Sequence, residues 1–325
     1  MKPTFCNQKP SSFAKIVELV ENYVRGEIEQ EIKDKQLCYH NLDHALAVKR
    51  RANIIFNAIK PILSTEYRVE ELQRLESLIN LCALAHDMVQ LFDDSPHPHQ
   101  PRKHLMGVSE TATANKLLRY IRNLNQKLLS YNLDAALLFS DRDQQIIQDA
   151  IRATICHQDP QAGKASYTFS TNSIYQPYLY EVRPKISIAG SIIALADLGT
   201  LGIDGINKYI ADGIQIFQEN NLDYEFLLSN YYLRDQLSAA DITVANNLKA
   251  RLLAMTRLMV SFAQERHARL ELEISGFSSP AQAILRQQIF IYLNQETIEE
   301  IKTIIPTQDN TSLEELISFF RCHKI

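Results

Sequence analysis

Glycine and long apolar stretches are both scarce in this chain. Only 9 of its 325 residues are glycine, and no stretch approaches the roughly 20 consecutive apolar residues that a membrane-spanning helix needs. The segment 1–7 lacks an apolar region of the kind that directs secretion. We therefore expect a cytoplasmic protein without a membrane span.

Cysteine content and net charge exclude two further classes of protein. The five cysteines are an odd number and show no C-x-x-C spacing, which indicates neither a disulfide framework nor a zinc knuckle. The formal net charge of -4 removes the electrostatic argument for dedicated nucleic-acid binding. A small anionic substrate could still bind at a local cluster of basic residues.

The apolar pattern predicts an all-α protein. Apolar residues recur at spacings of three and four, and alternating runs typical of strands are few. All candidate site residues precede residue 235, so we expect a functional helical domain over 1–234. The remainder, 235–325, is expected to be a C-terminal helical extension, with packing on the same core left open. The predicted helices are 12–34, 42–60, 67–89, 107–129, 142–157, 186–199, 203–219, 222–230, 238–274, 279–293, 295–304 and 312–321.

Polar residues that interrupt or end apolar segments are the most informative feature of the sequence. The pair His86-Asp87 closes the run 81–85, and Asp197 ends the similar run 192–196. His44 lies near the start of a predicted helix. Such groups are costly to bury unless something pairs with them, and a divalent cation is a strong partner. Adjacent residues on a helix point about 100° apart, so His86 and Asp87 can share an ion only if it lies near the helix end or between their two directions.

Five short motifs follow one another between residues 39 and 210. They are Tyr39-His40-Asn41-x-x-His44, His86-Asp87, Ser109-Glu110-x-x-Thr113-Ala114, Ile151-x-Ala153-Thr154-x-x-His157, and Asp197-Leu198-Gly199 with Tyr209. Their order resembles that of the HD-domain superfamily of metal-dependent phosphohydrolases. The first motif is also similar to the Y-H-N-x-x-H segment of cyclic-nucleotide phosphodiesterases, and a group of small predicted HD phosphohydrolases is similar at more points.

The resemblance implies an HD-type helical core and a role for each matching residue. The metal ligands fall on His44, His86, Asp87 and Asp197. His40 falls on a general acid that protonates the leaving oxygen, which suits an imidazole because its pKa lies near neutrality. Glu110 falls on an acidic position that orients or deprotonates the attacking water. His157 falls on a pocket histidine that contacts phosphate or a second metal.

The chain departs from the phosphodiesterase pattern at one position. Phosphodiesterases carry a histidine three residues after the His-Asp pair, and this chain has Gln90 there. In another HD subgroup a histidine lies three residues before a glycine, as His104 does before Gly107. Together with His157, His104 would complete a two-metal site, so the number of ions stays open.

These features predict a metal-dependent phosphohydrolase that acts on a phosphate ester of a nucleotide or small metabolite. We expect one divalent cation per chain, manganese, iron or magnesium in preference to zinc, with a second ion left open. Two alternatives remain: a non-catalytic HD module that senses a nucleotide or metal, and a di-iron HD oxygenase. A homodimer is expected on base rates alone.

Overall fold

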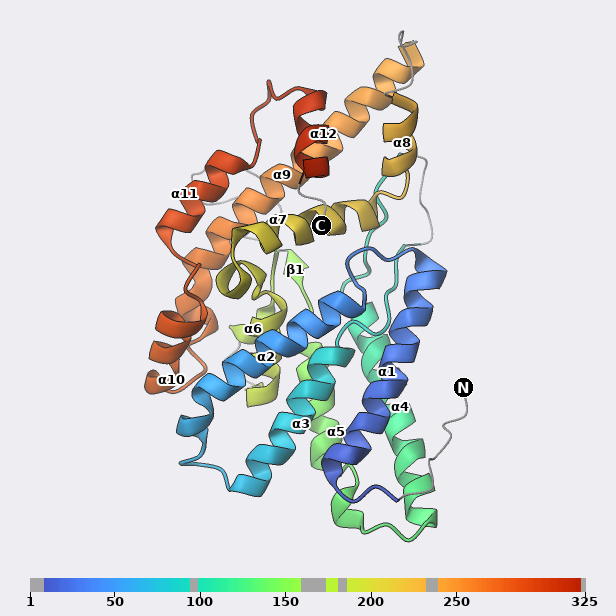
Figure 1. Ribbon diagram of the computed structural model, residues 1–325, viewed down its shortest axis with the longest axis vertical. Coiled ribbons are helices and arrows are strands. Elements are labelled where there is room, and N and C mark those ends of the chain that lie inside the picture. Colours follow the sequence, from blue (N-terminus) through green and yellow to red (C-terminus); the bar gives the residue numbers. More distant parts are fainter. Residues whose placement is uncertain (1–8, 94–98, 159–173, 181–185, 232–238, 323–325) are drawn as a thin grey trace.

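The computed structural model describes residues 9–93, 99–158, 174–180, 186–231 and 239–322, and within them the structure is almost entirely helical (Figure 1). The prediction of an all-α fold is confirmed. None of the described helices is long and apolar enough to cross a membrane. The α-helices are α1 (Phe13–Lys35), α2 (Leu42–Leu63), α3 (Val69–Ala85), α4 (Val108–Ser130), α5 (Asp141–Arg152), α6 (Ile188–Asp197), α7 (Ile206–Asn220), α8 (Tyr224–Tyr231), α9 (Ala239–Glu273), α10 (Ser279–Ile284), α11 (Gln295–Ile304) and α12 (Leu313–Cys322). The short elements are η1 (Ala135–Leu137), η2 (Pro177–Leu179), η3 (Thr200–Asp204), η4 (Leu285–Ile289), β1 (His157–Gln158) and β2 (Ile174–Tyr175).

Helices α1 to α6 form a bundle around α3. This helix contacts α1, α2, α5 and α6, and its segment from Leu81 to Ala85 is fully buried. Helix α6 is also apolar on nearly all sides and packs against α2, α3 and α5. A helix that is apolar all round is a core helix. The residues that end α3 and α6 are thus delivered to the interior of the bundle.

Helix α3 is shorter than predicted, because it ends at Ala85 and not at residue 89. Beyond it, the amide of Val89 donates to Thr113 Oγ1 at 3.0 Å, and the amide of Leu91 donates to Ser109 Oγ at 2.9 Å. These hydroxyls replace the intrahelical acceptors that a continuing helix would supply. The motif that contains Ser109 and Thr113 therefore fixes the path of the chain just after His86-Asp87.

Helix α5 also ends early, at Arg152 and not at residue 157. His157 and Gln158 instead pair antiparallel with Ile174 and Tyr175. The strand pairing competes with the helix for the same backbone groups, and a local apolar pattern carries no information about partners 16 and 18 residues away. His157 is therefore the first residue of β1 and not the last residue of a helix.

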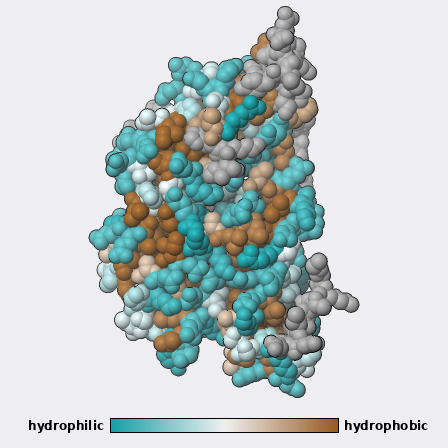
Figure 2. Space-filling view, in the orientation of Figure 1, coloured by the Kyte–Doolittle hydropathy of each residue, from teal (hydrophilic) through white to brown (hydrophobic). Residues whose placement is uncertain are grey.

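Of the C-terminal helices, α11 and α12 lie in the upper half of the molecule in Figure 1, whereas α10 lies lower, near the end of α2. Helix α9 contacts α7, α8, α11 and α12, while α10 and η4 contact α2. The segment after η4 closes on the turn that follows Asp197: a Cβ at Gly202 would lie 2.7 Å from the Phe290 ring, and the Tyr292 amide donates to the Gly202 carbonyl at 3.2 Å. Figure 2 shows a largely hydrophilic face with smaller apolar patches. The predicted boundary near residue 235 lies outside the described residues.

One buried ion pair ties α3 to the start of α5. Arg74 Nε and Nη2 donate to the two carboxylate oxygens of Asp143 at 2.9 and 2.5 Å, and the Ser140 amide donates to the same carboxylate at 2.6 Å. Burial of Asp143 acts in the opposite direction, but the hydrogen bonds from Arg74 and Ser140 hold its pKa below the usual value.

Replacing Asp143 with asparagine should lower the free energy of unfolding by about 2 kcal/mol at pH 7, because charge-assisted hydrogen bonds are lost. Since the pKa is lower in the folded state, this contribution is complete above the unfolded pKa of about 3.9 and disappears as the pH falls through the folded pKa. Denaturant unfolding of wild type and Asp143→Asn at neutral and acid pH measures the difference. Asp141→Asn, an exposed change in the same helical turn, should have little effect at either pH. An equally large loss at both pH values would contradict the prediction.

Candidate metal centre

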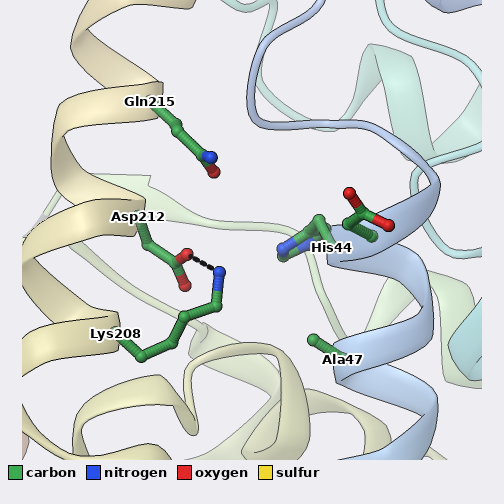
Figure 3. Close-up of a pocket in the computed structure, with 6 residues that line it drawn as sticks. His44, Ala47, Lys208, Asp212 and Gln215 are labelled. Atoms are coloured by element: carbon green, nitrogen blue, oxygen red, sulfur yellow. Dashed lines mark hydrogen bonds and ion pairs between the residues drawn. The ribbon is translucent and has the colours of Figure 1, made fainter. Parts of the chain in front are cut away.

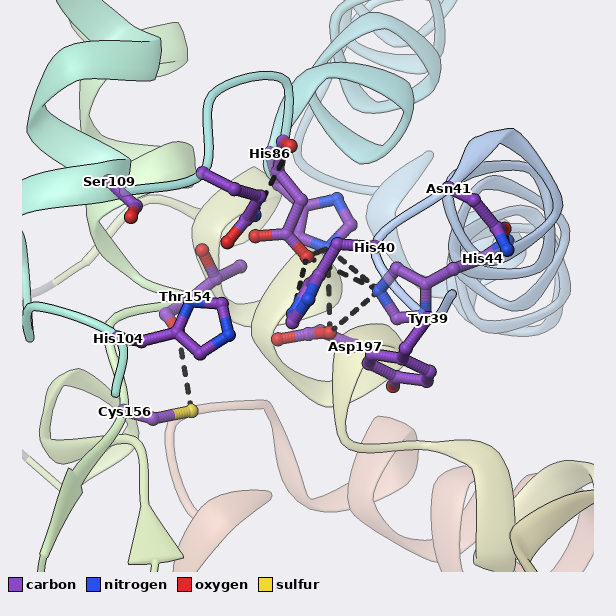
Figure 4. A network of polar contacts seen from close by, with 12 residues as sticks. Tyr39, His40, Asn41, His44, His86, His104, Ser109, Thr154, Cys156 and Asp197 are labelled. Atoms are coloured by element: carbon purple, nitrogen blue, oxygen red, sulfur yellow. Dashed lines mark hydrogen bonds and ion pairs between the residues drawn. The ribbon is translucent and has the colours of Figure 1, made fainter. Parts of the chain in front are cut away.

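Four side chains from three helix ends meet at one point in the bundle. One ligand atom from each of His44, His86, Asp87 and Asp197 lies within 4.8 Å of all the others. Figure 4 shows His44, His86 and Asp197 converging from the start of α2, the turn after α3 and the end of α6. Asp87 directly follows His86 in that turn. Both histidines are buried, and the two aspartates are partly exposed.

The ends of the helices explain this convergence. Asn41 caps α2, because its Oδ1 accepts from the His44 amide at 3.0 Å, and this sets His44 in the first turn. His86 is the residue after the end of α3, so Asp87 is already in a turn. The two side chains can therefore point to one place, with His86 Nε2 2.9 Å from Asp87 Oδ2. Asp197 is the last residue of α6.

Neighbouring groups orient two of the four ligand side chains. His86 Nδ1 lies 2.9 Å from the Ala83 carbonyl oxygen and can only donate to it, so in the neutral ring Nε2 carries the lone pair that faces the cluster. Gln176 Nε2 donates to Asp197 Oδ2 at 2.9 Å, which leaves Oδ1 directed toward the two histidines. Ordered outer partners of this kind are typical of metal ligands.

The distances within the cluster suit a small divalent cation. Ligand atoms about 2.1 Å from an ion lie about 3.0 Å apart in an octahedral arrangement and about 3.4 Å apart in a tetrahedral one. Nε2 of His44 lies 3.3 Å from His86 Nε2, 3.3 Å from Asp87 Oδ2 and 3.6 Å from Asp197 Oδ1. Two imidazole nitrogens and two carboxylates are a ligand set that manganese, iron and zinc all accept. These residues can therefore hold a metal ion.

His44 and His86 lie side by side, but their pKa values shift in opposite directions. Burial lowers the pKa of His44. Burial acts the same way on His86, but the charges of Asp87 and Asp197 outweigh it and raise the pKa of His86 well above its usual value. Two partly buried carboxylates thus create a strongly negative position that accepts either a proton or a cation.

A second cluster lies beside the first and contains His40, His104 and Glu219. Glu219 is buried near the end of α7, where it accepts from the amides of Tyr39 and His40 at 2.8 and 3.0 Å. One of its oxygens also contacts His40 Nδ1 in a short hydrogen bond and lies 3.7 Å from His104 Nε2. His40 Nε2 faces the other way, 3.8 Å from Asp87 Oδ2. His40 therefore bridges the two clusters.

Burial and the charge of Glu219 act in opposite directions on the pKa values of His40 and His104. Burial alone would lower the pKa of His40, but the charges of Glu219 and Asp87 raise it to about 9. Burial lowers the pKa of His104, whose Nε2 is buried and has no hydrogen-bond partner among the described residues. In the second cluster, His40 is thus held by Glu219, whereas Nε2 of His104 makes no hydrogen bond among the described residues.

Sequence reasoning missed Glu219 and Gln176. A carboxylate in the last turn of a helix opposes the helix dipole, and this unfavourable position of Glu219 in the predicted helix 203–219 was a usable signal. It also lies 4 residues after Gln215 and 7 after Asp212, on one helical face. Gln176 lies in a long predicted loop, and nothing in its local sequence links it to Asp197.

The remaining predicted site residues differ in position. Glu110 lies in the first turn of α4, and its buried Oε2 has no hydrogen-bond partner among the described residues. Burial, together with the charges of Asp87 and Asp197, raises the pKa of Glu110 to about 7. His157 is exposed and packs its ring toward Tyr175, outside both clusters. The roles expected for Glu110 and His157 stay predictions.

Compared with models of protein families, with curated proteins and with solved structures, the chain gives no match. No comparison confirms the resemblance to a family. The structure itself supports its coarser part, the helical fold and the possible metal cluster. The chain is helical, and the histidines and aspartates of the HD-type motif order form one cluster that could hold a metal ion.

Replacing Gln176 with leucine should weaken metal binding by about 10–100-fold, the usual cost of losing an outer partner of a ligand. The side chain is fully buried, and its amide is what orients Asp197. Titration of the metal-free protein with manganese, followed by calorimetry, measures the affinity. Gln282→Leu is the matched control, since Gln282 donates only to main-chain carbonyls near α10. Unchanged manganese affinity in Gln176→Leu would show that the Asp197 contact does not support a metal ligand.

Proposed function

We propose that this chain is a metal-dependent phosphohydrolase that cleaves a phosphate ester of a nucleotide or small metabolite. The observation that carries the proposal is the position of His40, an ionisable imidazole next to a four-ligand cluster. A cation bound by His44, His86, Asp87 and Asp197 would lower the pKa of a bound water and polarise a phosphoryl oxygen. Manganese, iron and magnesium are the ions we expect.

His40 is the proposed general acid. Its Nδ1 is held by Glu219, and its Nε2 faces the first cluster at 3.8 Å from Asp87 Oδ2. The buried carboxylate fixes both the orientation of the ring and the nitrogen that carries the outward proton. As the water oxygen bonds to phosphorus and the ester P–O bond breaks, His40 gives this proton to the departing oxygen.

Glu110 is the proposed partner of the attacking water. Its Oε2 is buried without a hydrogen bond among the described residues, which leaves an acceptor available. Burial is the main cause of its raised pKa, and the charges of Asp87 and Asp197 add to it, so Glu110 lies within their field. A carboxylate in this position can accept a hydrogen bond from water and orient it toward phosphorus.

A panel of phosphate monoesters and diesters, assayed with manganese-loaded protein, tests the activity. Wild type should release phosphate from at least one of them, and Asp87→Ala should lose both the bound metal and the activity, because Asp87 contacts both clusters. Asp134→Ala, a change at an exposed aspartate away from the site, is the control. An Asp87→Ala variant that stayed metal-loaded and active would contradict the assignment.

Replacing His40 with glutamine should lower kcat by about 100- to 10,000-fold, the usual contribution of a general acid, while the bound metal stays. Elemental analysis and steady-state kinetics measure the two quantities. His99→Gln is the matched control, because His99 also bonds a carboxylate, that of Asp223 at 2.9 Å, outside the two clusters. Loss of an ion from His40→Gln would instead make His40 a ligand.

The second cluster favours one other candidate, a di-iron oxygenase. His40, His104 and Glu219 could hold a second ion next to the first, and Asp87 would lie between the two. That reaction predicts two irons per chain and consumption of oxygen without release of phosphate. Metal analysis of the purified protein, together with measurement of oxygen uptake and phosphate release, separates the two candidates.

A further inference from the structure

A pocket lies between α2 and α7, directly beside the metal cluster (Figure 3). Its volume is about 160 Å³. One wall contains His44, which also belongs to the metal cluster, and the other wall comes from α7. The lining residues are Asp43, His44, Ala47, Lys208, Asp212 and Gln215. A phosphate ester held at the cluster could therefore extend its alcohol part into this pocket.

One polar stripe of α7 serves both the pocket and the second cluster. Lys208, Asp212, Gln215 and Glu219 follow one another at spacings of 4, 3 and 4 residues, which places them on one face of the helix. The apolar residues between them, such as Ile210, Ile214 and Phe217, are buried. The stripe thus runs from the pocket to His40, along one side of the candidate metal centre.

A chain of hydrogen bonds fixes the position of Asp212 in the pocket wall. Asp212 accepts from Lys208 Nζ at 2.7 Å and from Thr200 Oγ1 at 3.0 Å, and Thr200 in turn accepts from the buried Arg51 at 2.5 Å. Lys208 uses one of its three N–H groups in this bond and is 36% exposed. A fixed carboxylate and a partly exposed ammonium group with spare donors form a preorganised binding surface.

The chemistry of the lining suits hydroxyl groups. Asp43 and Asp212 offer acceptors, Lys208 offers donors and Gln215 offers both, and a hydroxyl group donates and accepts at once. Two carboxylates against one ammonium group disfavour a second anion. Among the lining residues the aromatic ring is the imidazole of His44, which belongs to the metal cluster. A nucleobase would therefore find no Phe, Tyr or Trp ring to stack on. The volume is also below the roughly 300 Å³ at which pockets for larger organic ligands begin.

We propose that this pocket binds the alcohol part of the substrate, and that this part is a sugar or polyol, with Lys208 as a specificity-determining residue. The assignment rests on the proposed phosphohydrolase function of the adjacent cluster, since that cluster would hold the phosphate. The substrate class is therefore a sugar or polyol phosphate, and not a nucleotide.

Calorimetric titration of the manganese-loaded full chain tests the pocket without requiring turnover. The probes are ribose 5-phosphate, orthophosphate and adenosine 5′-monophosphate. Wild type should bind ribose 5-phosphate more tightly than orthophosphate. Lys208→Gln should weaken ribose 5-phosphate binding about tenfold, because one charge-assisted hydrogen bond is lost, and should leave orthophosphate binding unchanged. Gln215→Leu should act in the same direction.

Lys302→Gln is the matched control. Lys302 is 37% exposed and, like Lys208, pairs with a carboxylate of its own helix, at 2.8 Å. It should bind every probe as wild type does. Lys208→Arg, which keeps the charge and the donors, should retain most of the affinity for ribose 5-phosphate and so separates a binding role from a purely structural one.

Three results would overturn the proposal. Equal losses for ribose 5-phosphate and orthophosphate in Lys208→Gln would make Lys208 a phosphate or folding residue. Unchanged binding of both would remove it from the site. Tighter binding of adenosine 5′-monophosphate than of ribose 5-phosphate would show that a base is recognised. Hydrolysis is measured separately: a chain that binds ribose 5-phosphate through Lys208 but never cleaves it keeps the pocket and loses the phosphohydrolase function.

Discussion

Mutual repulsion between Asp87 and Asp197, held within the same small volume, is the constraint on which the rest of the site depends. Their carboxylate oxygens lie 2.9 and 3.5 Å from His86 Nε2, so the histidine between them must carry a proton or share a cation. Burial works against any uncompensated charge at this place. The helix ends bring these groups together all the same, because α3 and α6 are core helices and His86 directly follows one while Asp197 ends the other. A divalent cation satisfies all four side chains at once, which no single proton can do.

The local sequence predicts most of the helices. Its predicted helix ends are wrong where a segment distant in sequence forms hydrogen bonds with the backbone beyond the helix. The sequence predicts α2 and α9 to within a few residues, since α2 has a clear N-cap in Asn41 and α9 contains no glycine or proline. The apolar periodicity overextends α3, because the hydroxyls of Thr113 and Ser109 take over the amides beyond its end. The periodicity also overextends α5, because His157 pairs with Tyr175 of β2 instead of continuing the helix. In both cases the deciding partner lies far away in sequence and is invisible to a periodicity argument.

The candidate site follows the same division. His44, His86, Asp87 and Asp197 were predictable because each is a polar group at the start or end of a helix, in a known motif order. Glu219 was missed because it lies beyond the last motif, which begins at Asp197. A buried carboxylate in the last turn of a helix nevertheless needs a compensating partner. That partner is the start of the first motif, through two amides and the His40 ring. His157 shows a limit of the same kind: a motif match does not determine whether the helix continues to that residue, and α5 ends at Arg152.

Helix α7 contributes side chains to both the second cluster and the pocket. Its polar stripe offers a carboxylate to His40 at one end and an ammonium group to the pocket at the other, and the His44 ring lies at the pocket wall between α2 and α7. A rotation of α7 would remove both contacts together, because the stripe is one face of one helix. The apolar side of α7 resists this rotation: Tyr209 donates to the Met259 carbonyl of α9 at 2.5 Å, and a Cβ at Gly213 would lie 2.7 Å from the Met259 side chain. Among the described residues, no member of either cluster comes from α8 to α12. Helix α9 nevertheless packs on the helix that positions the proposed acid and the proposed substrate pocket.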